Sequence, residues 1–193
     1  MNKILLVQQY LGLNHEVGPI FPIGLSYIAT SLSKTNWDVQ VLDMNVCQDP
    51  YESLFSSIEA FKPDVIGFSL RNIDNVDYDN FNYFYDELNT IIPILKSHCN
   101  FLICGGAGFS IFAAKIMVQH REIDFGILQE GEVTLVELLS SLSNRTPLSN
   151  VKGLYFWDSG TLRFTGDRAP INFSESDIPD RSFFDIQKYN KPL

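Results

Sequence analysis

Short apolar runs alternate along the first 146 residues with segments in which apolar side chains recur at helical spacing. The run Ile4–Val7 is apolar throughout, which is typical of a strand covered on both faces of a parallel sheet. In Ile23–Ser33, the residues Leu25, Ile28 and Leu32 fall on one helical stripe. The pair of patterns occurs five times, and predicts strands at 4–7, 38–43, 64–69, 100–104 and 124–128 and helices at 23–33, 51–61, 78–95, 109–118 and 131–142.

Five strand–helix pairs predict an α/β fold with a parallel sheet and helices on both faces. Their length favours the flavodoxin-like (Rossmann-like) strand order 2-1-3-4-5. After Pro147 the period changes, because residues 151–157 and 161–165 alternate around a turn at 158–160, which predicts a β-hairpin. The polar, proline-punctuated end indicates a linker or a wrapping tail. We therefore divide the chain into a domain at 1–146, a hairpin at 147–171 and a linker at 172–193.

The net charge of −9 argues against binding to nucleic acid or to an anionic membrane surface, since both require a basic face. No apolar run approaches the ~20 residues of a spanning helix, and the start of the chain is too short for a signal peptide. A cytoplasmic protein is therefore expected, with Cys47, Cys99 and Cys104 as reduced thiols. Their spacing matches no zinc or iron–sulfur pattern.

Candidate chemistry is sought in the loops after the strands, because open parallel sheets bind ligands beyond the carboxyl ends of their strands. The segment Gly105-Gly106-Ala107-Gly108 permits positive φ and close approach of a ligand, and the helix start that follows offers unpaired N–H groups. A tight turn that merely needs glycine explains it equally well. The segment is neither G-x-G-x-x-G nor a Walker loop, which counts against NAD and ATP.

Two further loops carry polar groups. In Ser69-Leu70-Arg71-Asn72 the serine can donate to a ligand and Arg71 can clamp a phosphate or carboxylate, although a surface cap paired with Asp74 or Asp77 is the alternative. Glu130-Gly131-Glu132 enters the last helix, where carboxylates also serve as simple caps. The chain offers no Ser-His-Asp or Cys-His arrangement and no facing carboxylate pair, so no catalytic residue is assigned.

In order and spacing, these segments resemble the N-terminal cobalamin-binding domain of cobalamin-dependent radical-SAM enzymes, a class with many methylases. The likeness covers nearly the whole chain and rests on 3–7, 21–29, 39–45, 63–69, 104–108, 124–132 and 174–193. It implies a corrinoid over the carboxyl ends of the strands, with its nucleotide tail buried between the sheet and the helices. The resemblance places the tail beside Ser69, Leu70, Gly105 and Gly106, and the ring or its amides opposite Arg71, Asn72, Gly108, Glu130, Gly131 and Glu132.

Two departures from related patterns qualify this resemblance. Other corrinoid domains carry Asp-x-His-x-x-Gly, with the histidine on cobalt, whereas Leu13 stands here at the aspartate position before His15. Cobalamin binding without a protein ligand to cobalt is therefore expected. The motif Cys-x-x-x-Cys-x-x-Cys is absent, so S-adenosylmethionine and an iron–sulfur cluster are expected only in a missing radical-SAM domain, which is the expected partner.

Two alternatives stay open. One is a degenerate domain of the same fold that acts as a cofactor-free interaction or substrate-docking module. The other is a different flavodoxin-like protein, either flavin-binding or a receiver domain. A receiver requires an acidic pair after the first strand and an aspartate after the third, where this chain has Gln8-Gln9 and Ser69-Leu70.

Overall fold

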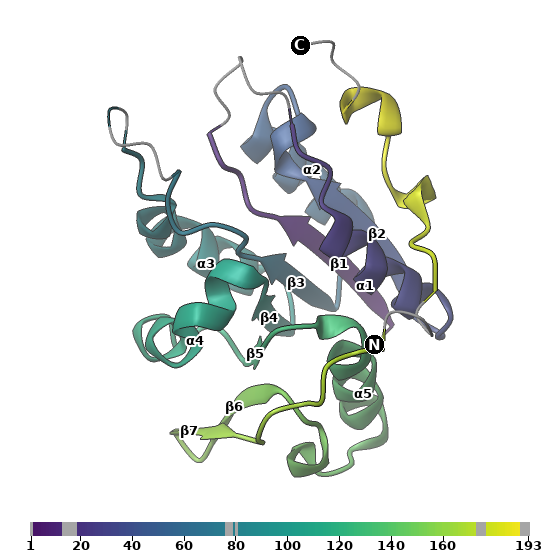
Figure 1. The fold of residues 1–193 in the computed structure, drawn as a ribbon, viewed down its shortest axis with the longest axis vertical. Helices are drawn as coiled ribbons and strands as arrows, with labels where there is room; N and C mark the ends of the chain where they lie inside the picture. The colour runs from purple at the N-terminus through teal and green to yellow at the C-terminus, as the bar shows by residue number, and fades with distance from the viewer. Residues whose placement is uncertain (1, 13–18, 76–78, 80, 173–176, 190–193) are drawn as a thin grey trace.

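The strands of the computed structural model form one mixed sheet in the order β2-β1-β3-β4-β5-β6-β7 (Figure 1). The structure describes residues 2–12, 19–75, 79, 81–172 and 177–189. The strands are β1 (Lys3–Gln8), β2 (Asp38–Asp43), β3 (Val65–Ser69), β4 (Phe101–Gly105), β5 (Phe125–Ile127), β6 (Leu154–Asp158) and β7 (Thr161–Phe164). The first five are parallel, which confirms the predicted order, and the hairpin β6–β7 continues the same sheet antiparallel to β5.

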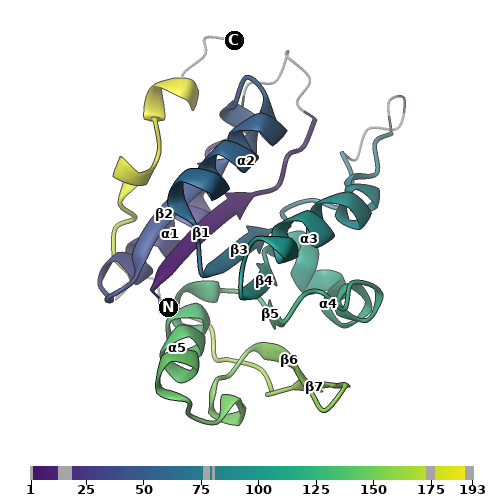
Figure 2. The same cartoon turned by 180° about the vertical axis from the view of Figure 1, so that it is seen from behind.

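In the part of the chain that the structure describes, five α-helices cover the two faces of the sheet (Figure 2). They are α1 (Ile23–Ser33), α2 (Pro50–Phe61), α3 (Leu88–Ser97), α4 (Ala107–Gln119) and α5 (Gly131–Asn144). Helices α1 and α5 pack over Ile4, Leu6 and Ile103, while α2, α3 and α4 pack over the alternate strand residues, such as Leu5 and Ile66. Because successive strand side chains point to opposite faces, each strand contributes to both cores.

The predicted helix at 78–95 is wrong at its start. Helix α3 begins only at Leu88, after a 3-10 turn at Phe84–Glu87. Before that turn the chain folds back on itself, with a bridge between Asp74 and Tyr83 and a bond from the Asn75 N–H to the Asn82 carbonyl at 3.2 Å. Backbone pairing therefore replaces the start of the helix that was predicted for this aromatic-rich stretch.

The segment after β7 crosses α5 and is fixed there by Arg168. Its guanidinium donates to Thr134 Oγ1 at 2.8 Å and to the Lys152 carbonyl at 3.2 Å, and it pairs with Glu137. The short 3-10 turns elsewhere are Met44–Val46, Leu148–Asn150, Arg181–Phe183 and Ile186–Tyr189.

The described part of the C-terminal tail packs along α1. The Asp180 N–H donates to Thr30 Oγ1 at 2.7 Å, and Phe184 meets Phe21 edge-on with ring centroids 4.9 Å apart. The Tyr189 hydroxyl then donates to Asp43 Oδ2 at 2.8 Å, at the carboxyl end of β2. The tail thus returns to the edge of the sheet where parallel strands end.

Among the described residues, no helix has the length and apolar character needed to cross a membrane. In the same part of the chain, no three His, Cys, Asp or Glu side chains come together as candidate metal ligands.

Candidate functional site

A cavity of about 520 Å³ lies between α1, α5 and the carboxyl ends of the parallel strands. Its floor is made of alternate strand residues, which face the same side of the sheet. Strand register aligns them in two rows. The inner row is Leu6, Gly67 and Ile103, and the outer row is Gln8, Ser69 and Gly105.

The walls of the cavity come from the start of α1 and the first turns of α5. Leu25 and Leu135 are buried apolar residues on these walls. Gly131 lets α5 approach α1, because a Cβ there would lie 3.1 Å from Ile28 Cδ1. The interior is therefore apolar, and polar groups such as Ser69 are confined to the outer row and the mouth.

Glycine widens the cavity at its floor. A Cβ on Gly67 would come within 2.8 Å of Leu6 Cδ2, so the missing side chain makes room for Leu6, which also lines the cavity. A Cβ on Gly105 would meet only the carbonyl and Cβ of Ile127, at 3.5 and 3.7 Å. The floor suits a flat group that lies directly on the sheet.

Gly106 and Gly108 have a different role. Gly106 has φ +99°, and a Cβ there would lie 2.6 Å from the Leu70 carbonyl oxygen. A Cβ on Gly108 would lie 3.0 Å from the Arg71 oxygen. Both glycines allow the start of α4 to pack against the backbone that follows β3.

The expectation of unpaired N–H groups at the start of α4 is wrong for two residues. The Gly108 N–H donates to the Arg71 carbonyl at 2.9 Å, and the Phe109 N–H donates to the Leu70 carbonyl at 3.2 Å. Carbonyls from another loop thus satisfy groups that an anion would need. This helix start is not a phosphate site of the usual kind.

Seven of the ten residues proposed from the sequence line the cavity: Ser69, Arg71, Gly105, Gly106, Glu130, Gly131 and Glu132. The other three do not. Leu70 is buried in the core on the opposite face, Asn72 donates its N–H to Gln9 Oε1 at 3.4 Å, and Gly108 packs on Arg71. His15 lies outside the described residues.

Sequence reasoning missed several lining residues, chiefly Gln8, Gly67 and Tyr27. A signal existed for two of them. Gly67 interrupts an otherwise apolar strand, and such a glycine often marks the close approach of a ligand. Gln8 is a polar residue at the carboxyl end of the central strand, where ligands of open sheets bind.

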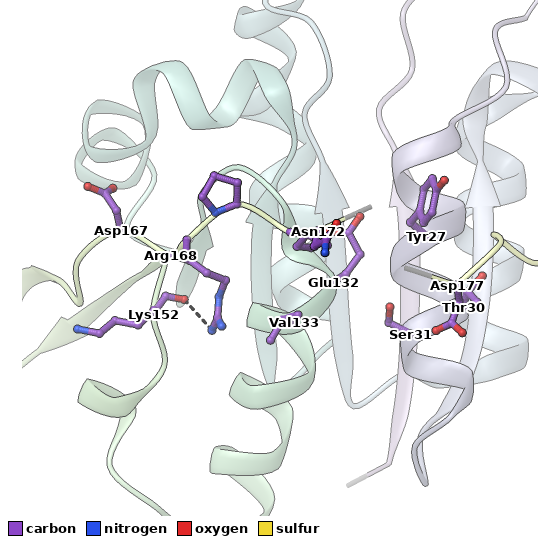
Figure 3. Close-up of a pocket in the computed structure, with 13 residues that line it drawn as sticks. Tyr27, Thr30, Ser31, Glu132, Val133, Lys152, Asp167, Arg168, Asn172 and Asp177 are labelled. Carbon is purple, nitrogen blue, oxygen red and sulfur yellow. Dashed lines mark hydrogen bonds between the residues drawn. The ribbon is translucent and has the colours of Figure 1, made fainter. Parts of the chain in front are cut away.

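Glu132 lies between two cavities. It also lines a groove of about 530 Å³ on the outer side of α1 and α5, beneath the segment that holds Arg168. Figure 3 shows its side chain projecting from α5 into the space toward Tyr27 of α1. Burial, with a smaller contribution from the charge of Glu130, raises the pKa of Glu132 above its usual range, and Oε2 has no hydrogen-bond partner among the described residues.

Replacing Glu132 with glutamine is expected to raise the melting temperature of the cofactor-free protein at pH 7 but not below pH 4.5, the ordinary pKa of the group. Because the folded chain holds this proton more tightly, the unfolded chain loses it first as the pH rises, and stability falls above that value. Circular dichroism melts at pH 4 and pH 7 measure the difference. Glu59→Gln, at an exposed position of α2, is the control; equal gains at pH 7 for both variants would contradict the prediction.

Comparison with known families gives one match along most of the chain. The model of the B12 binding domain matches residues 13–139. The hopanoid C-3 methylase of Methylococcus capsulatus is 27% identical over 177 residues, which cover 88% of this chain and 30% of that protein. An uncharacterised methyltransferase of Pyrococcus horikoshii is 27% identical over 171 residues, which cover 87% of this chain and 35% of that protein.

Solved structures show the same fold. The radical S-adenosylmethionine methyltransferase TsrM from Kitasatospora setae, with cobalamin and an iron–sulfur cluster bound, superposes with a TM-score of 0.75 at 23% identity. The match covers 93% of this chain and 32% of TsrM. The chain therefore spans about a third of the length of the relatives it matches.

Proposed function

The chain belongs to the B12-binding domain family, and we propose that the cavity between α1, α5 and the sheet holds the nucleotide tail of a cobalamin whose corrin ring lies over the carboxyl ends of the strands. The observation that carries this proposal is the shape of the cavity. Its floor has an apolar inner row of Leu6, Gly67 and Ile103, and its outer row carries the polar side chains of Gln8 and Ser69. A volume of about 520 Å³ is within the range of ligand pockets.

The nucleotide tail of a cobalamin has features that this cavity matches. Its benzimidazole base is flat and largely apolar, which fits the inner row, and its ribose and phosphodiester are polar, which fits the outer row and the mouth. Ser69 and Gln8 would bind polar atoms of the tail, and the guanidinium of Arg71 would oppose the phosphodiester charge. Of the groups at the mouth, Glu130 is already engaged, since its Oε2 accepts the Ile171 N–H at 3.1 Å.

The corrinoid, when bound, supplies a cobalt that carries a methyl group or takes part in a radical step. The chain's own residues would bind and orient it. The deep apolar row would exclude water from the base, and the absence of a side chain at Gly105 would let the tail lie against the sheet. No residue of the chain is assigned to bond breaking.

We further infer that the domain serves a larger enzyme. The relatives named above are methyltransferases about three times as long as the matched segment, and TsrM holds an iron–sulfur cluster as well as cobalamin. In this proposal the cluster and S-adenosylmethionine bind outside residues 1–193, in a radical-SAM domain that faces the corrin ring. The substrate would be chosen by that domain.

Titration of the purified chain with hydroxocobalamin tests the proposal. We expect saturable binding of one cobalamin per chain, followed by the absorbance of the bound corrinoid. Dicyanocobinamide, which lacks the nucleotide, is the matched control and should bind at least tenfold more weakly, or ~1.4 kcal/mol. Equal affinity for both corrinoids would show that the nucleotide tail does not bind in the cavity. Binding of neither would favour the cofactor-free docking module.

A further inference from the structure

Gln8 carries a polar group that the fold buries without a partner. The residue is 4% exposed, and its Nε2 has no hydrogen-bond partner among the described residues. A buried amide that is left unpaired destabilises the folded state. Native proteins contain few such groups, so a buried amide that borders a cavity indicates a partner supplied by a ligand.

The described neighbours of Gln8 do not pair with its Nε2. In the sheet it lies between Ser69 of β3 and Asp43 of β2, its two register neighbours. The carboxylate of Asp43 accepts from the backbone and side chain of Asn45 at 3.0 and 2.8 Å and from the Tyr189 hydroxyl at 2.8 Å. Gln8 lines the cavity, so a ligand bound there could accept a hydrogen bond from Nε2.

The arrangement of the floor fixes how an amphipathic base would lie. Its apolar rings would cover the inner row, including Gly67, so its polar edge would turn toward the outer row, where Gln8 ends β1. A benzimidazole that is not coordinated to cobalt has a free ring nitrogen, which accepts a hydrogen bond. A phenolic base, as in p-cresolylcobamide, has no such nitrogen.

We propose that Gln8 selects among cobamides by donating a hydrogen bond from Nε2 to a ring nitrogen of the buried base. The proposal rests on the proposed function, because it assumes that the tail enters this cavity. Sites built to hydrogen-bond a ligand group discriminate against analogues that lack it, since the buried polar group is then left unpaired. The chain would thus favour cobamides with benzimidazole or purine bases over those with phenolic bases.

The test compares the affinity for cobalamin and for p-cresolylcobamide in three proteins: the parent chain, Gln8→Met and Gln9→Met. Methionine keeps the length of the side chain and removes the donor. Gln9 is a matched control, because it is buried at the same strand end with an unpartnered Nε2 but does not line the cavity. Affinities are measured by corrinoid absorbance, and folding by circular dichroism.

We expect the parent to prefer cobalamin at least tenfold, Gln9→Met to keep this preference, and Gln8→Met to reduce it to threefold or less through weaker cobalamin binding. A folded Gln8→Met protein with the parental preference, or a parent with no preference, would overturn the proposal and leave the proposed function intact. Failure of the parent to bind either cobamide would overturn both. If Gln8→Met does not fold, Gln8→Glu replaces the donor with an acceptor, and the same loss of preference is expected.

Discussion

Replacing Gly106 with alanine is expected to lower the free energy of unfolding by about 3–5 kcal/mol, the sum of backbone strain and a steric overlap. The new Cβ would lie 2.6 Å from the Leu70 carbonyl oxygen and 3.0 Å from its carbon. Neither atom is at the end of a flexible side chain, so the backbone after β3 would have to move. The φ of +99° adds a conformation that alanine rarely adopts.

Two other glycines separate the causes of this loss. Gly160 has φ +81°, and a Cβ at this position would have no atom within 4 Å, so Gly160→Ala should cost only about 1–2 kcal/mol of backbone strain. Gly24, inside α1, has neither strain nor contact, and Gly24→Ala should be neutral or stabilise by up to ~1 kcal/mol. Urea unfolding of the cofactor-free proteins gives the three values. If Gly106→Ala lowered the free energy of unfolding no more than Gly160→Ala does, the backbone after β3 would be able to move at little energetic cost.

Gly105→Leu is expected to abolish most cobalamin binding while the protein stays folded. At Gly105 the backbone is unstrained and a Cβ would make ordinary contacts, so the larger side chain can be built. It would then occupy the outer row of the cavity, next to Ser69, where the proposed tail must pass. We expect an affinity loss of at least 100-fold, or ~2.7 kcal/mol, in the hydroxocobalamin titration.

The control for this variant is Thr161→Leu, which adds leucine at an exposed position of β7, outside the cavity. It should bind cobalamin as the parent does. The unfolding midpoint of Gly105→Leu should also stay close to that of the parent. A folded Gly105→Leu protein with parental affinity would mean that the cofactor does not use this cavity.

The topology was predictable because hydrophobic periodicity reports it directly. The strands β1, β3, β4 and β5 are apolar on both faces, and each crossover carries a helical stripe, so the order β2-β1-β3-β4-β5 follows from few rules. The segment before α3 was not predictable in this way. Phe81 and Tyr83 lie two residues apart, which is not a helical spacing, and they are 62% and 41% exposed and precede the helix.

The position of the cavity was predictable, but its lining only in part. The loops chosen from the sequence line it, because parallel strands end at one edge. The roles of Gly106 and Gly108 depend on the carbonyls of Leu70 and Arg71, which lie more than thirty residues earlier in the chain. A contact between such distant residues cannot be predicted from the local sequence pattern. The floor likewise depends on register between strands, which is why Gln8 and Gly67 were not proposed.

The hydrogen bond between Tyr189 and Asp43 fixes the end of the described tail at the carboxyl edge of the sheet, as Figure 1 shows. Asp43 also holds Asn45, whose side chain binds the backbone of Gln9 and Leu11 after β1. A domain joined after this tail would therefore start at the edge of the sheet over which we propose that the corrin ring lies. Short tethers give effective concentrations in the millimolar range. Even if such a domain bound the corrinoid only weakly, the tether would keep the two in contact most of the time.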